Sequence, residues 1–571
     1  MRRLLIILVC VLPSLGFAQI ENPNFWTANN YTPSYQKLID WYQQLAREDA
    51  RFNLLNEGLS DAGKPIYSFQ IIPKGWKRSG GMVLFINNAI HPGEPCGVNA
   101  SAQLAYEIYM GKKEISNTAI VIIPAYNIGG MLNRSSYSRA NQLGPKEYGF
   151  RGNANNLDLN RDFIKMDSEN SKVFAKIFHR WKPEIFVDTH TSNGADYPYT
   201  GTLITTQIDK LGKPLGDFVK EQLEPFLYQQ VRIDDWPLVP YIYGFNGKDT
   251  PLEGGISDYM DSPRYSTGYT ALFGTVGFVT EAHMYKPFPA RVLFTQTFLE
   301  ELYRWMEMPR NRAGLQAAQN AYYQSQITKT ELPISWTITD ATADSLYFTQ
   351  YKKEQEISKV TGLDHWIYNT QKMETRQIPH RRITTQVNRK VPPYYLVPAS
   401  NKKVVERLQL AGVIMKKARK VRYEVNVYKF TKVEAIKMPY EGHYYHNVVE
   451  IDTARLFVFL SAPYYEVSTN QMAKRFIVET LEPDAPDSFF RWNFFDSCLQ
   501  QKEYFSAFSF EPKMNDYLEK NPELRVQLNQ AKKEDPELRN SHQKQLDFLY
   551  SNSPFQEKTA FVYPVYRGVN K

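Results

Sequence analysis

The sequence predicts an α/β domain followed by a smaller, β-rich domain. The first part of the chain alternates short apolar runs with amphipathic stretches, which is typical of a largely parallel sheet covered by helices. The runs are residues 82–86, 119–123, 185–187 and 276–279, and the amphipathic stretches include 98–109 and 172–181. Past residue 310 the pattern changes to alternating β-branched and aromatic residues, as in 334–339, 422–429 and 456–460. With 571 residues, the chain is long enough for two or more domains.

The composition is that of an ordinary globular protein. Hydrophobic residues make up 43% of the chain and charged residues 22%, which excludes wholesale disorder. The formal net charge of +8 is small for this length, so no nucleic-acid partner is expected. The densest basic run, residues 416–422, is interpreted as a solvated face. The aromatic content of 14% suits β-rich structure.

The first 18 residues have the pattern of a signal peptide. Arg2 and Arg3 precede an apolar segment, residues 4–12, and small residues around Ala18 suit cleavage after that residue. We therefore expect a secreted or periplasmic protein. No later stretch reaches about 18 uninterrupted apolar residues, so we expect no integral membrane segment once the signal is removed.

The remaining elements follow in order along the chain. Thr32 and Pro33 predict a helix start, since a cap residue before proline is typical of one. Two near-repeats, Asn521-Pro522 and Asp535-Pro536, predict helix starts in the same way. We divide the chain into a signal peptide at 1–18, the α/β domain at 19–310, a helical connector at 311–330 and the β-rich domain with a helical tail at 331–571. Cys96 and Cys498 could pair or stay free.

Residues suited to binding a metal follow two of the apolar runs. His91 and Glu94 come after the first run in a Gly/Pro-rich turn, and His190 follows the run at 185–187. Ligands in open α/β sheets bind beyond the carboxyl ends of the strands, so these three side chains can meet there. Two histidines and one glutamate form a three-ligand zinc set that leaves the fourth position to water. Glu281, after the last run, is the natural general base.

The segment between the metal ligands is rich in groups that hold carboxylates. It runs from Arg151 to Phe163 and contains Asn160 and Arg161. Arginine offers a planar fork that binds a carboxylate through two hydrogen bonds. The sequence contains no serine-hydrolase elbow, phosphate-binding loop or His-Glu-x-x-His helix. It therefore gives no support to a serine hydrolase, a P-loop nucleotide enzyme or a zincin-type protease.

The order of these motifs resembles the zinc metallocarboxypeptidases, the carboxypeptidase A-like family. The resemblance rests on His91-x-x-Glu94, Asp158-x-Asn160-Arg161, His190 and Glu281, and it spans roughly residues 30–310. It implies a three-layer α/β/α sandwich around a mixed sheet, with residues 19–310 as the catalytic domain. It also implies one Zn²⁺ per chain and the removal of single residues from a peptide that ends in a free carboxylate.

The resemblance also implies a role for each residue of the motifs. His91, Glu94 and His190 would bind zinc, and Asp158 would hold the other ring nitrogen of His91. Glu281 would activate the zinc-bound water and pass its proton to the leaving amine. The remaining assignments concern the substrate: Asn160 and Arg161 would grip its terminal carboxylate, and Arg151 would stabilise the oxyanion.

Several choices stay open at this stage. The loop 258–269 offers three tyrosines and an arginine as substrate contacts, of which we name Tyr259 and Arg264. Side-chain preference is undetermined. The carboxypeptidase function has two alternatives. One is a cell-wall (murein) peptide amidase on the same fold, and the other is a catalytically silent protein that binds peptide or glycan. The tyrosine-rich segment 440–445 could stack on sugar rings or lie in an edge strand or core.

Overall fold

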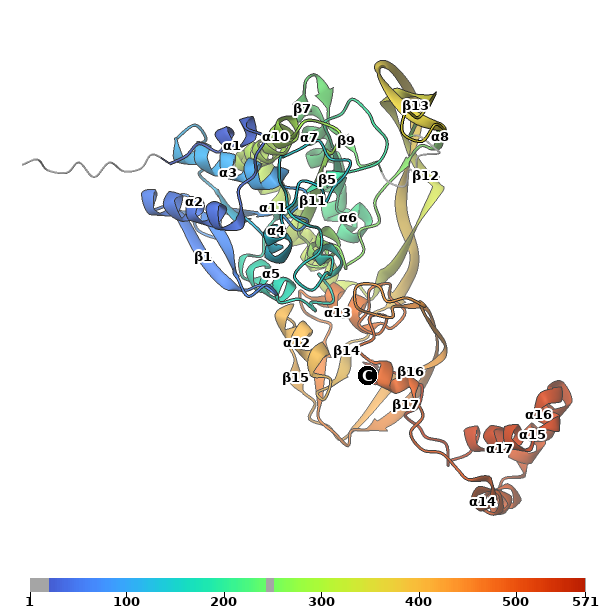
Figure 1. Ribbon diagram of the computed structural model, residues 1–571. Coiled ribbons are helices and arrows are strands. Elements are labelled where there is room, and N and C mark those ends of the chain that lie inside the picture. Colours follow the sequence, from blue (N-terminus) through green and yellow to red (C-terminus); the bar gives the residue numbers. More distant parts are fainter. Residues whose placement is uncertain (1–19, 243–250, 570–571) are drawn as a thin grey trace, which may run out of the picture.

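A mixed eight-stranded sheet forms the centre of the first half of the protein (Figure 1). The computed structural model describes residues 20–242 and 251–569, so the predicted signal peptide lies outside the described residues. The strand order is β1 (Phe52–Leu59), β2 (Pro65–Ile71), β4 (Thr118–Ile123), β3 (Met82–Asn87), β5 (Ile185–Ser192), β11 (Val276–His283), β6 (Gly201–Thr205) and β9 (Val239–Pro240). Strands β4, β3, β5 and β11 are parallel, while β1, β2 and β6 pair antiparallel. The four apolar runs of the sequence are the four central parallel strands.

Helices cover both faces of this sheet. Phe186 of β5 contacts Phe174 of α5 (Glu169–Trp181), with ring centroids 5.7 Å apart. Phe278 of β11 contacts Phe298 of α10 (Phe288–Glu307), with centroids 5.8 Å apart. In the register of β5 and β11, Phe278 lies beside Val187, the neighbour of Phe186, so the two phenylalanines point to opposite faces. The expected α/β/α sandwich around a mixed sheet is therefore confirmed.

The other helices of this half belong to the outer layers, except the short helix 251–254, which contacts residues 331–390 of the second half. They are α1 (Asn24–Ala28), α2 (Tyr35–Glu48), α3 (Cys96–Tyr109), α4 (Ile128–Leu132), α6 (Ile208–Phe218), α7 (Glu224–Gln230), α8 (Pro251–Gly254), α9 (Ser266–Ala271) and α11 (Pro309–Thr328). Helix α2 begins two residues later than Thr32-Pro33 predicts, because the Ser34 side chain accepts the cap hydrogen bond from Lys37 N at 3.5 Å. Within the described residues, no helix is both long and apolar enough to cross a membrane.

The second half is built on a six-stranded sheet and a long hairpin. The sheet order is β15 (Lys416–Lys417), β18 (Tyr464–Ser468), β14 (Tyr394–Pro398), β19 (Tyr566–Gly568), β16 (Arg422–Ala435) and β17 (His446–Phe459). The hairpin pairs β12 (Glu331–Ile357) with β13 (Asp364–Lys390), and β10 (Ile256–Ser257) of the first half adds a parallel strand to β13. The first half also contains a separate two-stranded ribbon of β7 (Arg232–Ile233) and β8 (Trp236–Pro237).

The helices of the second half include the predicted helical tail. They are α12 (Lys402–Leu410), α13 (Lys474–Leu481), α14 (Ala507–Lys520), α15 (Pro522–Glu534), α16 (Pro536–Asn540) and α17 (His542–Ser551). Asn521 and Asp535 stand immediately before α15 and α16, which confirms both predicted starts. Helices α14–α17 project away from the body (Figure 1) and enclose a small core of their own.

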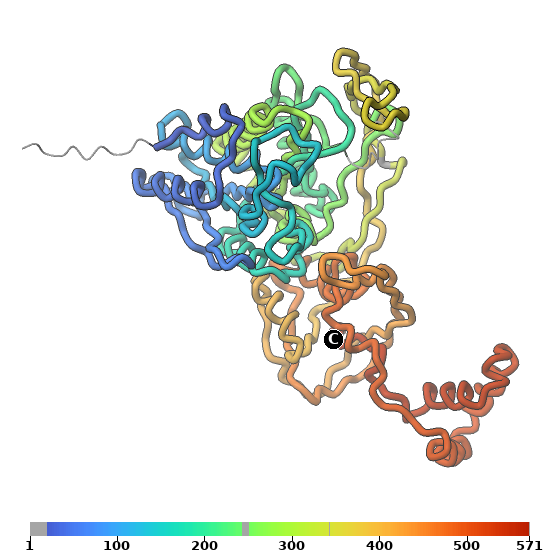
Figure 2. The backbone as a smooth tube through the Cα atoms, viewed as in Figure 1, coloured from blue at the N-terminus to red at the C-terminus, as the bar shows by residue number. Residues whose placement is uncertain are grey.

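One hydrophobic core extends through both halves, which lie against each other in Figure 2. Tyr269 of α9 contacts Phe476 of α13, with ring centroids 6.2 Å apart. Helix α11 packs into the same core through Leu315 and Tyr322, so it is part of the body. Cys96 and Cys498 are both free. Because the halves share a core, side chains of the second half can contact loops and turns of the first half.

The start of α3 packs closely against the strands that carry the metal-ligand candidates. A Cβ atom on Gly97 would clash with Thr189 Oγ1 of β5 and with Asn88 Oδ1. We therefore expect Gly97→Ala to lower the free energy of unfolding by about 1–3 kcal/mol, since the extra methyl group overpacks a fixed contact. Urea denaturation of both proteins measures the change. Gly80→Ala is the control, because a Cβ there meets no atom within 4 Å; equal stability of the two variants would contradict the prediction.

Candidate active site

A cleft of about 450 Å³ opens at the carboxyl ends of the parallel strands. This is where open α/β sheets bind ligands. Its lining combines the predicted metal ligands and base with arginines and tyrosines: His91, Glu94, Arg139, Arg151, Asn160, Arg161, His190, Tyr241, Tyr259, Tyr265 and Glu281. Side chains from β5, β11 and the turns after β3 and before α5 thus share one cavity.

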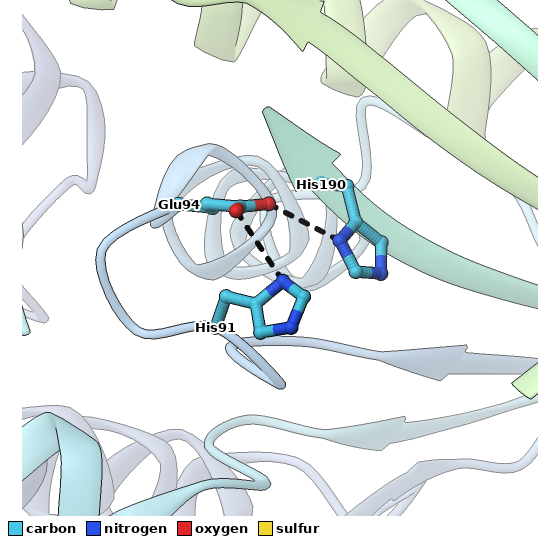
Figure 3. A group of neighbouring side chains, drawn as sticks. All are labelled: His91, Glu94 and His190. Atoms are coloured by element: carbon cyan, nitrogen blue, oxygen red, sulfur yellow. Dashed lines mark hydrogen bonds and ion pairs between the residues drawn. The ribbon is translucent and has the colours of Figure 1, made fainter. Parts of the chain in front are cut away.

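The side chains of His91, Glu94 and His190, which all line the cleft, point toward one another (Figure 3). His91 Nδ1 lies 3.3 Å from Glu94 Oε1, and His190 Nδ1 lies 3.1 Å from Glu94 Oε2. A tetrahedral zinc with bonds of about 2.0–2.1 Å places its ligands about 3.3 Å apart, so the separations fit that ion. His91 Nδ1 is buried and has no hydrogen-bond partner among the described residues, which is the state expected of a metal-binding nitrogen.

A carboxylate faces the opposite nitrogen of each histidine ring. Asp158 Oδ1 lies 2.8 Å from His91 Nε2, and Asp188 Oδ2 lies 3.3 Å from His190 Nε2. These contacts orient both rings with Nδ1 toward Glu94. Asp188 is absent from the residues that the sequence analysis selects. Its signal is present, because residues two apart on a strand share a face and Asp188 and His190 both lie on β5.

Arginines balance the buried charge of Glu94. Arg139 Nη1 lies 2.8 Å from Glu94 Oε1, and Arg151 Nη1 lies 3.5 Å from the same oxygen. Burial alone would raise the pKa of Glu94, but Arg139 and then His91 hold this pKa well below its usual range. Glu94 is therefore ionised, as a carboxylate that could bind a metal has to be. Sequence analysis does not select Arg139, since it lies in a segment that follows no apolar run.

Glu281 stands beside His190 on the neighbouring strand. The two residues are register partners of β11 and β5, so their side chains leave the sheet on the same face. Burial raises the pKa of Glu281 to about 8, although His190 opposes the shift. A carboxylate with a raised pKa is the stronger base for taking a proton from water.

The predicted carboxylate-binding residues lie on one tight turn. Asp158 accepts a hydrogen bond from the backbone N of Asn160 at 2.9 Å and closes the 3₁₀ turn Leu159–Arg161. Arg151 pairs with Asp158 Oδ2 at 2.9 Å. Burial opposes ionisation of Asp158, yet His91 and then Arg151 hold its pKa far below the usual range. Both Asn160 and Arg161 line the cleft.

The loop 258–269 divides between the cleft and the interior. Tyr259 and Tyr265 line the cleft and contact each other, with ring centroids 5.2 Å apart. Tyr269 is fully buried. Arg264, the other residue of this loop that we predict as a substrate contact, is not among the residues that line the cleft. Its Nε instead donates to Asp487 Oδ1 at 2.8 Å, because the second half supplies a buried carboxylate that attracts the guanidinium.

Two residues of the second half reach the turn from Asp158 to Arg161. Tyr440 OH accepts a hydrogen bond from Arg161 Nε at 3.0 Å, and Glu441 Oε2 accepts one from Asp158 N at 2.8 Å. Sequence analysis singles out Tyr440 only as part of an aromatic segment, and nothing local marks Glu441. Contacts between residues more than 270 positions apart leave no periodic pattern in the sequence, so they could not be predicted from it.

Comparisons with known proteins found similarity among solved structures. No family model matches the sequence, and no match was found among curated proteins. A metallo-carboxypeptidase from Burkholderia cenocepacia is 14% identical at a TM-score of 0.34, over 47% of this chain and 67% of that one. Carboxypeptidase A from Helicoverpa armigera is 15% identical at a TM-score of 0.36, over 51% and 75%. A metallo-carboxypeptidase from Pseudomonas aeruginosa, in complex with (2-guanidinoethylmercapto)succinic acid, is 13% identical at 0.34, over 48% and 68%.

Solved metallocarboxypeptidases are thus among the structures that this chain resembles. The likeness covers about half of the chain and assigns no activity by itself. Whatever chemistry the chain performs has to be inferred from the geometry of the cleft.

We expect Asp158→Asn to weaken zinc binding by about 10- to 100-fold, because an amide no longer fixes the His91 ring as a carboxylate does. Competition with a chromogenic chelator measures the affinity. Asp217→Asn, an exposed change on α6, is the control and should bind zinc like the unchanged protein. Equal zinc affinity of the Asp158 and Asp217 variants would show that Asp158 does not support zinc binding by His91.

Proposed function

We propose that this protein is an exported, zinc-dependent metallocarboxypeptidase that hydrolyses the C-terminal peptide bond of its substrate. The observation that carries the proposal is the convergence of His91, Glu94 and His190 beside the buried Glu281 in a cleft that also contains Arg161. In this proposal residues 1–18 direct export, 19–310 perform catalysis and 331–571 form the accessory part, joined through 311–330.

The three ligands are suited to one zinc ion per chain. Two imidazoles and a carboxylate are ligands that zinc accepts in catalytic sites. When bound there, zinc would act as a Lewis acid and lower the pKa of water. Asp158 and Asp188 keep the two rings in the ligating orientation.

Glu281 moves the proton in the proposed reaction. Its carboxylate accepts a proton from the attacking water and later delivers that proton to the nitrogen of the leaving amine. The environment suits both steps, since a pKa of about 8 lets the group bind and release a proton near neutral pH. Arg151, whose guanidinium lines the cleft, would donate hydrogen bonds to the oxyanion of the tetrahedral intermediate.

Asn160 and Arg161 would select substrates that end in a free carboxylate. Arg161 offers a planar fork that matches a carboxylate, and its guanidinium carbon lies 4.6 Å from the centre of the Tyr265 ring, which supports the fork from one side. Tyr259 lies next to Tyr265 and would contact the terminal residue of the substrate. The preference for that residue would depend on the tyrosines around it.

Glu281→Gln should reduce turnover by about 10²–10⁴-fold, because an amide keeps the shape of the side chain but accepts no proton. Zinc content, measured by elemental analysis, should stay at that of the unchanged protein. Mass spectrometry of a mixed peptide library, before and after chelation, measures the loss of single C-terminal residues. Glu48→Gln, an exposed change on α2, is the control.

Unchanged turnover in Glu281→Gln would contradict the assignment of Glu281 as the group that transfers the proton. If the zinc-loaded protein cleaves no peptide ending in a free carboxylate, the carboxypeptidase proposal is wrong. Digested murein fragments then distinguish a cell-wall peptide amidase, which releases products, from a silent peptide- or glycan-binding protein, which releases none.

Arg161→Ala should lower kcat/KM for peptides with a free C-terminus by about 10- to 100-fold, the size expected for losing a hydrogen-bonded ion pair. Steady-state kinetics on one peptide series measures the change. Arg47→Ala, an exposed change at the end of α2, serves as the control. A loss no larger than that of Arg47→Ala would remove Arg161 from the substrate site.

A further inference from the structure

The hairpin of β16 and β17 ends in a tight turn of defined geometry. Tyr440 N donates to His443 O at 2.8 Å, and His443 N donates to Tyr440 O at 3.1 Å. The two central residues, Glu441 and Gly442, have φ angles of +50° and +78°. Positive φ at both central positions is what a type I′ hairpin turn requires. We call residues 440–443 the hairpin tip.

The hairpin tip contacts both ends of the turn that carries the predicted carboxylate-binding residues. At one end, Glu441 Oε2 accepts a hydrogen bond from Asp158 N at 2.8 Å. At the other, Tyr440 OH accepts one from Arg161 Nε at 3.0 Å. Two adjacent residues of the second half therefore bracket the segment from Asp158 to Arg161.

The contact with Tyr440 decides how Arg161 presents its guanidinium. Nε is held by Tyr440, and Nη1 donates to the backbone oxygen of Asn160 at 2.8 Å. Nη2 makes no hydrogen bond with the described residues and is left for a ligand in the cleft that Arg161 lines. The nearest carboxylate, Asp158 Oδ2, forms an ion pair with Nη1 at 3.8 Å, which is longer than a hydrogen bond and leaves the fork without a hydrogen-bonded carboxylate partner. A fork fixed before binding loses less conformational entropy when a carboxylate arrives.

The hairpin tip is itself firmly anchored. The Tyr440 ring stacks on Trp492, with centroids 6.1 Å apart and planes at 21°. His443 Nε2 lies 2.7 Å from Asp167 Oδ2, and Arg407 Nη2 donates to Asp167 Oδ1 at 3.0 Å. Asp167 belongs to the first half, so the anchor joins the two halves a few residues beyond Arg161.

We propose that the hairpin tip is a positioning element that fixes Arg161 and Asp158 for substrate binding. The second half is then part of the carboxylate-recognition site, and the two halves form one catalytic unit. This inference rests on the proposed function, because it assigns the hairpin tip to the recognition of a terminal carboxylate.

The test removes one oxygen atom from Tyr440. Tyr440→Phe keeps the ring stacked on Trp492 and deletes the acceptor of Arg161 Nε. Binding is measured by calorimetry in the Glu281→Gln background with zinc bound, using one peptide as its free acid and as its C-terminal amide. We expect Tyr440→Phe to weaken binding of the free acid by about 3- to 10-fold and to leave binding of the amide unchanged. In the active enzyme, the same change should raise KM more than it lowers kcat.

Matched variants separate positioning from general damage. Tyr444→Phe removes a hydroxyl from the residue that follows the hairpin tip, where the side chain is 55% exposed, and should change neither affinity. Glu441→Ala should weaken binding of the free acid, while Glu441→Gln, which keeps an oxygen to accept from Asp158 N, should restore it. Thermal denaturation of each variant excludes unfolding as the cause.

The outcomes distinguish this inference from the proposed function. A preference of the background protein for the free acid, combined with no effect of Tyr440→Phe, overturns the positioning role and leaves the function standing. Equal weakening of acid and amide binding also overturns it, because the effect would then be independent of the carboxylate. Without any preference for the free acid in the background protein, the proposed function itself fails.

Discussion

The carboxylate of Asp158 is the group on which the arrangement of the site depends. One oxygen holds the His91 ring and the backbone of Asn160, and the other pairs with Arg151. A single side chain thus orients a proposed metal ligand, closes the turn that carries Arg161 and places the arginine proposed to face the oxyanion. Its burial would be unfavourable for an isolated charge, and the neighbouring cations compensate for it.

Charge compensation also explains the different states of the two glutamates in the cleft. Glu94 has Arg139 at 2.8 Å and stays ionised in spite of burial. Glu281 is nine-tenths buried but lacks a close cation among the described residues, so burial raises its pKa to about 8. Two carboxylates in one cavity therefore divide their tasks, one suited to binding a cation and the other to accepting a proton.

The shared core brings residues of the second half against the elements that carry the candidate site. Asp487 takes up Arg264 of the loop that also carries Tyr259, and the hairpin tip contacts the turn that carries Arg161. Trp492 joins these contacts, since its ring stacks with Tyr440 and lies under the Arg264 guanidinium at 4.8 Å. The residues that line the cleft all come from the first half, and the second half holds Arg161 and Asp158 from behind the lining.

The central sheet and the convergence of His91, Glu94, His190 and Glu281 could be predicted from the order of residues along the chain. Apolar runs mark parallel strands, and the carboxyl ends of such strands meet at one edge, so residues that follow different runs can be placed together without knowing the rest of the fold. The same reasoning could have found Asp188, which shares a strand face with His190. The pattern of apolar runs, with the polar residues that follow them, therefore predicts most of the candidate metal site.

The partners that complete the site, by contrast, depend on how distant parts of the chain pack. The positions of Arg264 and Arg161 depend on Asp487 and Tyr440, which lie 223 and 279 residues away along the chain. Hydrogen bonds and ion pairs of this kind depend on how the two halves pack against each other. The periodicity of side chains along the sequence indicates only which face of a helix or strand is buried. For that reason the sequence offered Arg264 as a substrate contact, whereas the packed structure turns it into a link between the halves.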